Sequence, residues 1–268
     1  MNKEDLVSVI MPTYNAGKYL ADSMNSILNQ TYKNLELLIT DDASTDPTTL
    51  QLLKEYASKD ERVKILYLKE NHGAGYARNK SIERAKGRYI AFCDSDDRWT
   101  TDKLEKQIAF MNKKKCALSC ASYIIFDGET QNEIGFCTAP KKITYSMMKR
   151  DNKVGCLTAV YDVQMLGRKF FMPTIRKRQD WALFLQIIRE CKVCYAYPDK
   201  PLAYYCMRRN SISSNKMSLM KYNISVYKEI LGFHPIKANL YFFTLFLPTY
   251  GAKILKRKFD SYTFTHRK

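Results

Sequence analysis

The 268-residue sequence lacks any uninterrupted apolar run of about 18 residues, the length that a membrane-spanning helix requires. Residues 1–15 also lack the apolar stretch of a secretory signal, so we expect a protein that starts and stays in the cytoplasm. The eight cysteines are scattered, and only Cys191 and Cys194 form a CxxC pair, with no second pair at zinc-site spacing. Reduced thiols are therefore expected.

Acidic residues are scarce in the later part of the chain. Residues 1–100 contain 14 Lys or Arg and 15 Asp or Glu, whereas the remaining residues contain 30 basic and 12 acidic ones. The net charge of +17 therefore arises after residue 100. This excess predicts a negatively charged partner, such as phosphate, anionic lipid or nucleic acid.

Regularly spaced apolar runs dominate the first hundred residues. The four runs are Leu6–Met11, Leu35–Thr40, Val63–Leu68 and Arg88–Cys93. The stretches between them have helical spacing: Gly17–Gln30, a helix capped by Asp46 before Pro47, and Tyr76–Lys86 with Gly87 as its C′ residue. Strands that alternate with helices in this way predict βαβ units and a parallel sheet buried on both faces.

The pattern changes after residue 100. Helices are expected at Lys103–Lys114 and Asp180–Arg189, and a strand at Leu118–Phe126 that ends in a turn at Asp127 and Gly128. Residues 129–178 are basic and are expected to be irregular.

Acidic residues follow two of the predicted strands directly, in the sequences DDASTD (41–46) and DSDD (94–97). The carboxyl ends of parallel strands meet at one edge of a sheet, where ligands bind. Carboxylates gathered there would repel one another unless a cation lay between them, and their oxygens suit Mg²⁺ or Mn²⁺. Such a cation usually completes its coordination with substrate phosphates, which predicts a nucleotide-diphosphate site. The alternative is that these acids only cap helices and form turns, which we favour for Asp46 alone.

The segments VSVIMPTYNAGKYL, ELLITDDASTD, NHGAGYARNKSIERAKGRYIAFCDSDD and QDW occur in this order over residues 6–215. In these segments the sequence resembles the family 2 glycosyltransferases. The resemblance implies the α/β GT-A fold, with a Rossmann-like, mainly parallel central sheet, helices on both faces and here a C-terminal helical, basic extension. It implies a catalytic domain at residues 1–217, with a nucleotide-binding half (1–100) and an acceptor-binding half (101–217), followed by the extension at 218–268.

The resemblance also assigns roles to residues that match the family's motifs. Pro12, Thr13 and Tyr14 would frame the nucleobase, with Tyr14 near its ring. Asp42 would accept a hydrogen bond from a uracil-type N–H, which favours UDP.

Further roles concern the diphosphate and the metal ion, which would be Mn²⁺ or Mg²⁺. Arg78 would lie near the diphosphate, Asp96 would contact ribose and the metal shell, Asp97 would be the direct metal ligand, and Asp94 would support them. The segment Tyr204–Asn215 resembles the loop that closes over the donor, where Arg208 or Arg209 could pair with the diphosphate. A solvated basic loop is the alternative.

The implied reaction is an inverting displacement by an acceptor hydroxyl, which requires a proton acceptor. Asp180 occupies the position of the family's catalytic Asp, although Gln179 replaces the acid that precedes it in many relatives. The alternative is an Asp that merely caps a helix. No QxxRW motif follows, so transfer of a single sugar is expected rather than processive synthesis. His72, His234 and His266 are poor rivals for the base.

Leu240–Leu247 is apolar and precedes a basic cluster, a combination that suits the surface of an anionic membrane. The alternative is a terminal helix packed on the catalytic domain. A lipid-linked glycan acceptor in bacterial surface polysaccharide synthesis would explain a peripheral location on the inner face of the membrane. A metal-dependent nucleotidyltransferase and a non-catalytic nucleic-acid-binding protein are the alternative functions, but no nucleic-acid partner is expected, because acidic strand ends repel phosphates without a metal.

Overall fold

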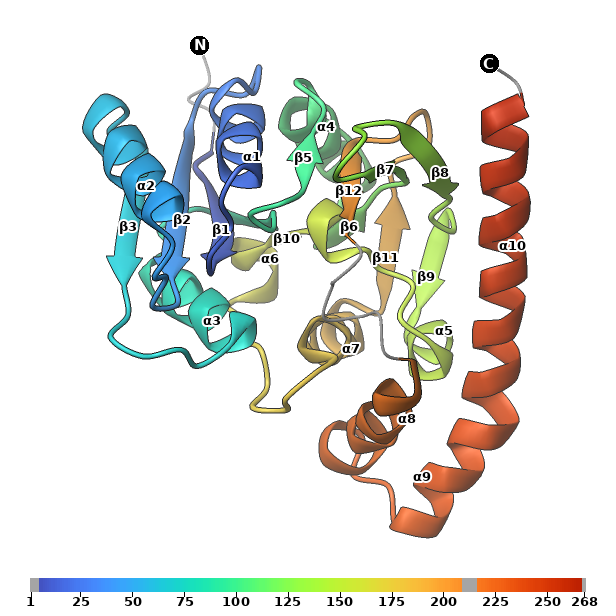
Figure 1. Cartoon of the computed structure of the whole chain (residues 1–268). Helices are drawn as coiled ribbons and strands as arrows, with labels where there is room; N and C mark the ends of the chain where they lie inside the picture. Colours follow the sequence, from blue (N-terminus) through green and yellow to red (C-terminus); the bar gives the residue numbers. More distant parts are fainter. Residues whose placement is uncertain (1–4, 209–215, 267–268) are drawn as a thin grey trace.

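The computed structural model describes residues 5–208 and 216–266, and its largest element is an eight-stranded sheet (Figure 1). The strand order is β3-β2-β1-β4-β10-β6-β11-β9. Four parallel strands form one side of this sheet: β1 (Val7–Thr13), β2 (Leu35–Asp41), β3 (Val63–Tyr67) and β4 (Tyr89–Phe92). Each coincides closely with a predicted apolar run, and the predicted α/β fold with a mainly parallel sheet is confirmed.

Helices cover both faces of the sheet, because β1 and β2 are buried throughout and alternate residues point to opposite sides. Val9 and Leu37 pack with α1 (Tyr19–Leu28), α2 (Pro47–Lys59) and α4 (Lys103–Lys114). Ile10 and Leu38 pack on the other side with α3 (Ala74–Arg84) and α7 (Gln179–Cys191).

Helix ends follow the predicted chemistry in one case and depart from it in another. Asp46 caps α2 by accepting hydrogen bonds from the amide and hydroxyl groups of Thr49. The assignment of Gly87 as a helix C′ residue was wrong, because α3 ends at Arg84 and Ala85 follows it. Gly87 instead lies against β1, where an added Cβ would meet the Ser8 amide nitrogen at 2.6 Å and the Leu6 carbonyl oxygen at 2.7 Å.

The prediction that residues 129–178 are irregular was wrong. This segment forms β8 (Glu133–Cys137), β9 (Lys142–Thr144), α5 (Tyr145–Arg150), the 3₁₀ helix η1 (Cys156–Thr158), β10 (Val160–Asp162) and α6 (Val163–Leu166). β10 even lies inside the central sheet, antiparallel to both neighbours. These elements have three to six residues each, too short for a clear periodic signal, and β9 and β10 pair with strands distant in the sequence.

The single strand predicted at Leu118–Phe126 is two strands in different sheets. β6 (Leu118–Cys120) joins the central sheet beside β11 (Val193–Ala196), whereas β7 (Tyr123–Asp127) joins a four-stranded sheet with order β5-β12-β7-β8. The other members of that sheet are β5 (Arg98–Trp99) and β12 (Ala203–Met207). The predicted turn follows β7, with Asp127 Oδ1 accepting from the amides of Glu129 and Thr130.

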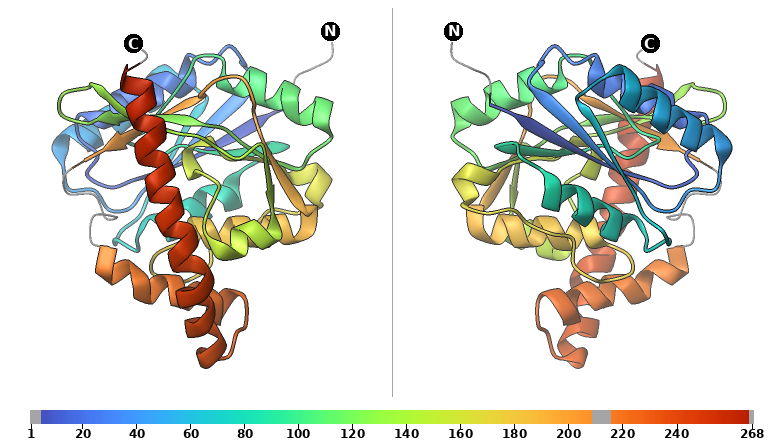
Figure 2. Two further views of the ribbon diagram at one scale, coloured as in Figure 1. Left: turned by 90° about the vertical axis from the view of Figure 1, so that its right-hand side faces the viewer. Right: turned by 90° about the vertical axis from the view of Figure 1, so that its left-hand side faces the viewer.

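The C-terminal part is helical, as predicted, and lies against the preceding part of the chain. It consists of α8 (Lys216–Ser225), the π-helix η2 (Val226–Ile230), α9 (Pro235–Tyr241), the π-helix η3 (Phe242–Phe246) and α10 (Leu247–His266). Figure 2 shows α10 running along one side of the molecule. Phe136 of β8 stacks on Phe264, and Thr138 donates to Asp260 at 2.7 Å.

Two residues of the apolar run Leu240–Leu247 belong to the protein core. Phe242 is fully buried and Phe246 is 2% exposed, and Phe246 packs on Trp181 with ring centroids 5.6 Å apart. The packed-helix alternative is therefore correct for this face of the segment. Within the described residues, every helix is too short or too polar to cross a bilayer.

Candidate active site

Three strand ends meet at one edge of the central sheet, as the sequence predicts. β1 pairs with β2 through Thr13 and Asp41, and with β4 through Ile10 and Phe92. Pro12 and Thr13 end β1 and are buried, and the Thr13 hydroxyl has no hydrogen-bond partner among the residues that the structure describes. Tyr14 follows with 52% of its surface exposed, so its ring is accessible to a ligand.

The loops after β1 and β2 form one continuous rim. Asn15 and Ala43 adopt left-handed backbone conformations, with φ of 44° and 63°. The Asn15 amide donates to the Ser44 hydroxyl, and its side-chain oxygen accepts from the amides of Thr45 and Asp46 at 2.9 and 3.0 Å. These bonds fix Tyr14 beside the end of β2.

Asp42 holds the neighbouring loop between β3 and α3. Its residue exposure is 2%, and its two carboxylate oxygens accept from the backbone amides of His72 at 2.9 Å and Gly73 at 2.7 Å. The role predicted for Asp42 toward a uracil-type N–H remains a prediction, and the structure adds this organising role to it.

Arg78 and Asp94 form a partly buried ion pair behind the rim. Arg78 Nη2 donates to Asp94 Oδ1 at 2.5 Å, and within residues 5–208 and 216–266 the buried Arg78 Nε atom has no partner. Burial acts to lower the pKa of Arg78, but the carboxylates of Asp94 and Asp180 outweigh it and raise that pKa above its usual range. Arg78 therefore stays charged.

Asp96 and Asp97 have different environments. Arg208 pairs with Asp96 at 2.5 Å, and the Asp96 side chain remains 17% exposed. Asp97 is 2% exposed, and its Oδ1 accepts from the Cys206 amide at 2.9 Å. Asp96 therefore offers an accessible carboxylate, whereas Asp97 faces the protein.

Within DSDD, burial and neighbouring carboxylates raise the pKa of Asp96 and of Asp97. Burial and the charge of Asp94 raise the pKa of Asp96, although Arg208 acts in the opposite direction. Burial, together with Asp96 and Asp94, raises the pKa of Asp97 well above its usual value. Crowded acids of this kind are stabilised by a cation, as the sequence predicts.

Asp180 lies in the first turn of α7, and its charge acts on Arg78. Its Oδ2 accepts a hydrogen bond from Asn152 Nδ2 at 2.9 Å. The contact between the N-terminal ends of α3 and α7 explains this proximity, because a Cβ added to Gly75 would overlap the side-chain amide of Gln179. Gln179, which stands where many relatives have an acid, thus packs directly against the GYARN segment.

Two residues near Asp180 were missed from the sequence. Asn152 lies in the segment interpreted as irregular, and no local pattern marks it. Cys156 lies among these charges: burial raises the pKa of its thiol, Arg78 lowers it, and Asp94, Asp180 and Asp97 raise it, with a net increase well above the usual value. A protonated thiol is a poor nucleophile, so the site depends on its carboxylates.

Part of the predicted donor-closing loop is a strand. Within Tyr204–Asn215, residues up to Met207 belong to β12, and Arg208 follows it with its guanidinium 5.3 Å from the ring centroid of Tyr19. Arg209 and the rest of that segment, through residue 215, lie outside the described residues.

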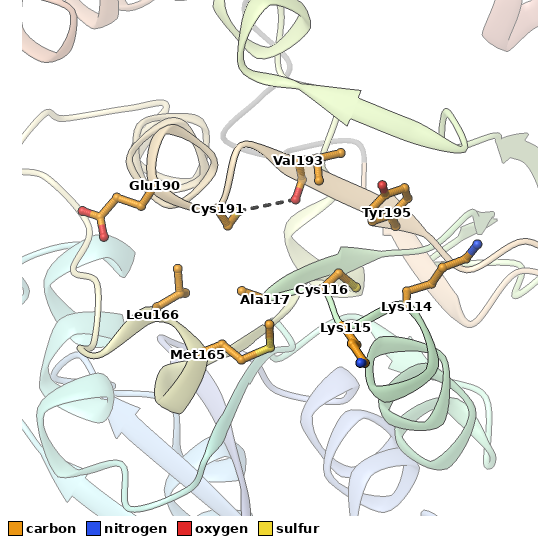
Figure 3. Close-up of a pocket in the computed structure, with 10 residues that line it drawn as sticks. All are labelled: Lys114, Lys115, Cys116, Ala117, Met165, Leu166, Glu190, Cys191, Val193 and Tyr195. Carbon is orange, nitrogen blue, oxygen red and sulfur yellow. Dashed lines mark hydrogen bonds between the residues drawn. The ribbon is translucent and has the colours of Figure 1, made fainter.

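A pocket of about 370 Å³ lies elsewhere on the molecule, between the C-terminal ends of α4 and α7 (Figure 3). Cys116, Met165 and Cys191 are among the residues that line it, and none of the predicted site residues does. The donor site predicted from the sequence is thus distinct from this pocket.

Residues 8–171 match the protein-family model described as glycosyl transferase family 2. The chain belongs to this family. A family 2 glycosyltransferase of Bacillus subtilis, the putative teichuronic acid biosynthesis glycosyltransferase TuaG, is 43% identical over 89% of this chain and 93% of its own length. The Escherichia coli UDP-Glc:alpha-D-GlcNAc-diphosphoundecaprenol beta-1,3-glucosyltransferase WfgD is 38% identical over 81% of this chain and 83% of its own. The predicted glycosyltransferase activity is confirmed, and the comparisons support neither the nucleotidyltransferase nor the nucleic-acid-binding alternative.

Solved structures confirm the GT-A fold of this glycosyltransferase. Staphylococcus aureus TarS 1–349 in complex with UDP-GlcNAc superposes with a TM-score of 0.68, at 22% identity over 88% of this chain and 70% of that one. The mannosyltransferase PcManGT of Pyrobaculum calidifontis, in complex with GDP-Man and Mn²⁺, has a TM-score of 0.66 at 17% identity, over 95% of this chain and 75% of that one.

A divalent metal ion is common in GT-A glycosyltransferases, and the carboxylates of this chain fit one in part. Within residues 5–208 and 216–266, no three His, Cys, Asp or Glu side chains are arranged to hold a metal. Asp94 and Asp96 nevertheless provide hard oxygen ligands with partly exposed side chains. One or two carboxylates suffice where substrate phosphates complete the coordination.

Proposed function

We propose that this glycosyltransferase transfers a single sugar from a UDP-sugar to a hydroxyl of a lipid-linked glycan, with inversion at the anomeric carbon. The product would enter a bacterial surface polysaccharide. The supporting observation is that the charge of Asp180 acts on Arg78, whose guanidinium pairs with Asp94, which links a candidate base to a candidate diphosphate site. The name of the relative WfgD, a UDP-Glc:alpha-D-GlcNAc-diphosphoundecaprenol beta-1,3-glucosyltransferase, supports the UDP donor and the lipid diphosphate acceptor.

In the proposed complex, the nucleoside lies on the rim formed by the first two strand ends. Pro12 and Thr13 line its floor, the exposed ring of Tyr14 packs on the base, and Asp42 accepts from its N–H. The unpaired hydroxyl of Thr13 gives the ligand a hydrogen-bonding group within the protein.

Two arginines and a metal ion would neutralise the diphosphate. Arg78 and Arg208 are already paired with acids of DSDD, so they can exchange a carboxylate for a phosphate oxygen. Asp96, supported by Asp94, is a better metal ligand than Asp97, because the Asp97 carboxylate is buried and accepts from Cys206. A bound Mg²⁺ or Mn²⁺ would stabilise the negative charge that builds up on the leaving diphosphate.

Asp180 would act as the base of an in-line displacement. The acceptor oxygen forms a bond to the anomeric carbon while the bond from that carbon to the β-phosphate oxygen breaks, and its electron pair leaves with UDP. Asp180 takes the proton of the acceptor hydroxyl. Asn152 holds the carboxylate in place through Oδ2.

A product assay with Asp180→Asn tests this proposal. The wild-type protein should release nucleoside diphosphate, and not pyrophosphate, from a UDP-hexose or UDP-N-acetylhexosamine when a lipid-linked acceptor is present. Asp180→Asn should bind the donor as the wild type does and lose transfer by at least about 10²-fold, because general-base catalysis contributes that much. Full transfer by Asp180→Asn would exclude Asp180 as the base.

The proposed location is the cytoplasmic face of the membrane, where the protein would be peripherally bound. The lipid-linked substrates named for the relatives and the basic C-terminal extension support this location.

A further inference from the structure

The C-terminal helices expose a continuous row of large apolar side chains, which we call the outer stripe. Its members are 37–75% exposed: Ile236, Leu240, Phe243, Leu247, Leu255, Phe259 and Tyr262. They follow one another at intervals of three or four residues, with Gly251 in the position between Leu247 and Leu255. This spacing places them along one face of a helix through α9, η3 and α10.

The opposite face of the same helices packs on the protein. Ala238 and Phe242 are fully buried, and Phe246 is nearly so, against a core that includes Trp181. The outer stripe is therefore additional to the residues that the fold requires. An exposed apolar row of this extent marks an interaction surface.

Positive charge identifies the kind of surface that the outer stripe contacts. Residues 218–268 contain nine Lys or Arg and two acids, and Lys237, Lys256 and Lys258 are exposed beside the stripe. Apolar side chains flanked by lysines suit a bilayer with anionic headgroups. A second copy of the chain fits less well, because two stripes in contact would bring these lysines together.

The helix that presents the outer stripe also contacts the loop that holds the proposed base. Lys253 of α10 donates to the Asn152 carbonyl oxygen at 2.5 Å and pairs with Asp151 at 3.0 Å. Asn152 in turn donates to Asp180. Two residues thus connect α10 to Asp180, so a membrane on the outer side of α10 would lie close to the acceptor site.

We propose that the outer stripe docks the protein on an anionic lipid bilayer, with α9 and α10 lying along the surface. Docking orients Asp180 toward acceptors whose lipid is anchored in that bilayer. This inference rests on the proposed function for its lipid-linked acceptor, but the binding surface itself can be tested without any transfer reaction.

The test measures co-sedimentation of the whole protein with vesicles. The wild type should bind vesicles that contain phosphatidylglycerol more tightly than pure phosphatidylcholine vesicles, and high salt should weaken binding. The double variant Leu255→Gln/Phe259→Gln should bind at least about tenfold more weakly, because it removes two large apolar side chains from the contact. The control Met165→Gln/Phe171→Gln removes two exposed apolar side chains, one on α6 and one shortly after it, away from α10 (Figure 1), and should bind as the wild type does.

Calorimetry with a UDP-sugar separates this proposal from the proposed function. The outer-stripe variant should keep donor binding and thermal stability, because both residues are exposed. Equal vesicle binding by the variant and the wild type would overturn the inference. The inference would also be overturned if the wild type formed a dimer and did not bind vesicles, and the outer-stripe variant were a monomer. The outer stripe would then contact a second copy of the chain. Failure of the wild type to bind the UDP-sugar would instead contradict the proposed function.

Discussion

At the scale of single residues, the site depends on side chains that hold neighbouring groups in place. Asp42 fixes the loop before α3 through two amides, and Asn152 fixes Asp180. The motifs predicted which acids gather at the strand ends. They could not predict that Asp97 faces the Cys206 amide while Asp96 stays accessible, because that difference depends on β12, more than 100 residues later.

Asn152 provides a test of positioning. Asn152→Ala should lower kcat about tenfold and leave KM for the donor unchanged, because the donor site is intact. Asn152→Asp should place a like charge beside Asp180 and lower kcat further than Asn152→Ala does, again with the KM for the donor unchanged. The matched control Asn112→Ala removes an amide that pairs with Tyr89 outside the site and should keep the wild-type kcat. A wild-type kcat in both Asn152 variants would contradict a positioning role for this contact.

At the scale of elements, length decided what could be predicted. β1 and β2 have seven residues each and are apolar enough to be recognised alone. β6, β9 and β10 have three residues each and depend on partners distant in the sequence. The C-terminal helices were predicted as helical, but an apolar run cannot reveal which of its residues face the core.

The two faces of the C-terminal helices should differ in their contribution to stability. Phe246→Ala should lower the free energy of unfolding by about 3–5 kcal/mol, because it leaves a cavity beside Trp181. Phe243→Ala, at a position 55% exposed, should lower it by less than about 1 kcal/mol. Urea denaturation measures both values. Similar losses for the two variants would contradict the packing of Phe246 against Trp181.

At the scale of the whole molecule, the burial of one lysine opposes folding. Lys103 is fully buried, and burial lowers its pKa to about 7 although Cys93 acts to raise it. Its ammonium group lies 4.1 Å from the ring centroid of Trp99 and donates to Gln107. The unfolded chain therefore binds one more proton than the folded chain between about pH 7 and 10, so the cost of burying Lys103 is greatest at and below pH 7.

Lys103→Met tests this titration through the pH dependence of stability. Between pH 7 and 10 the wild type should gain roughly 3 kcal/mol of unfolding free energy relative to the variant, because Lys103 is protonated in the unfolded chain and neutral in the folded chain over that range. Urea denaturation at several pH values gives this difference, in which groups common to both proteins cancel. If the difference in unfolding free energy between the two proteins did not change with pH, that would contradict a Lys103 that is buried in its neutral form.

The central claim is that the carboxylates of DSDD hold a cation that binds the diphosphate of the donor. Calorimetric titration with UDP, in Mn²⁺ and then in a chelator, tests it most directly. The wild type should bind UDP at least about tenfold more tightly with Mn²⁺, and Asp96→Asn should lose this dependence to a greater extent than Asp97→Asn. UDP affinity that is equal with and without Mn²⁺, and equal in the three proteins, would contradict the claim.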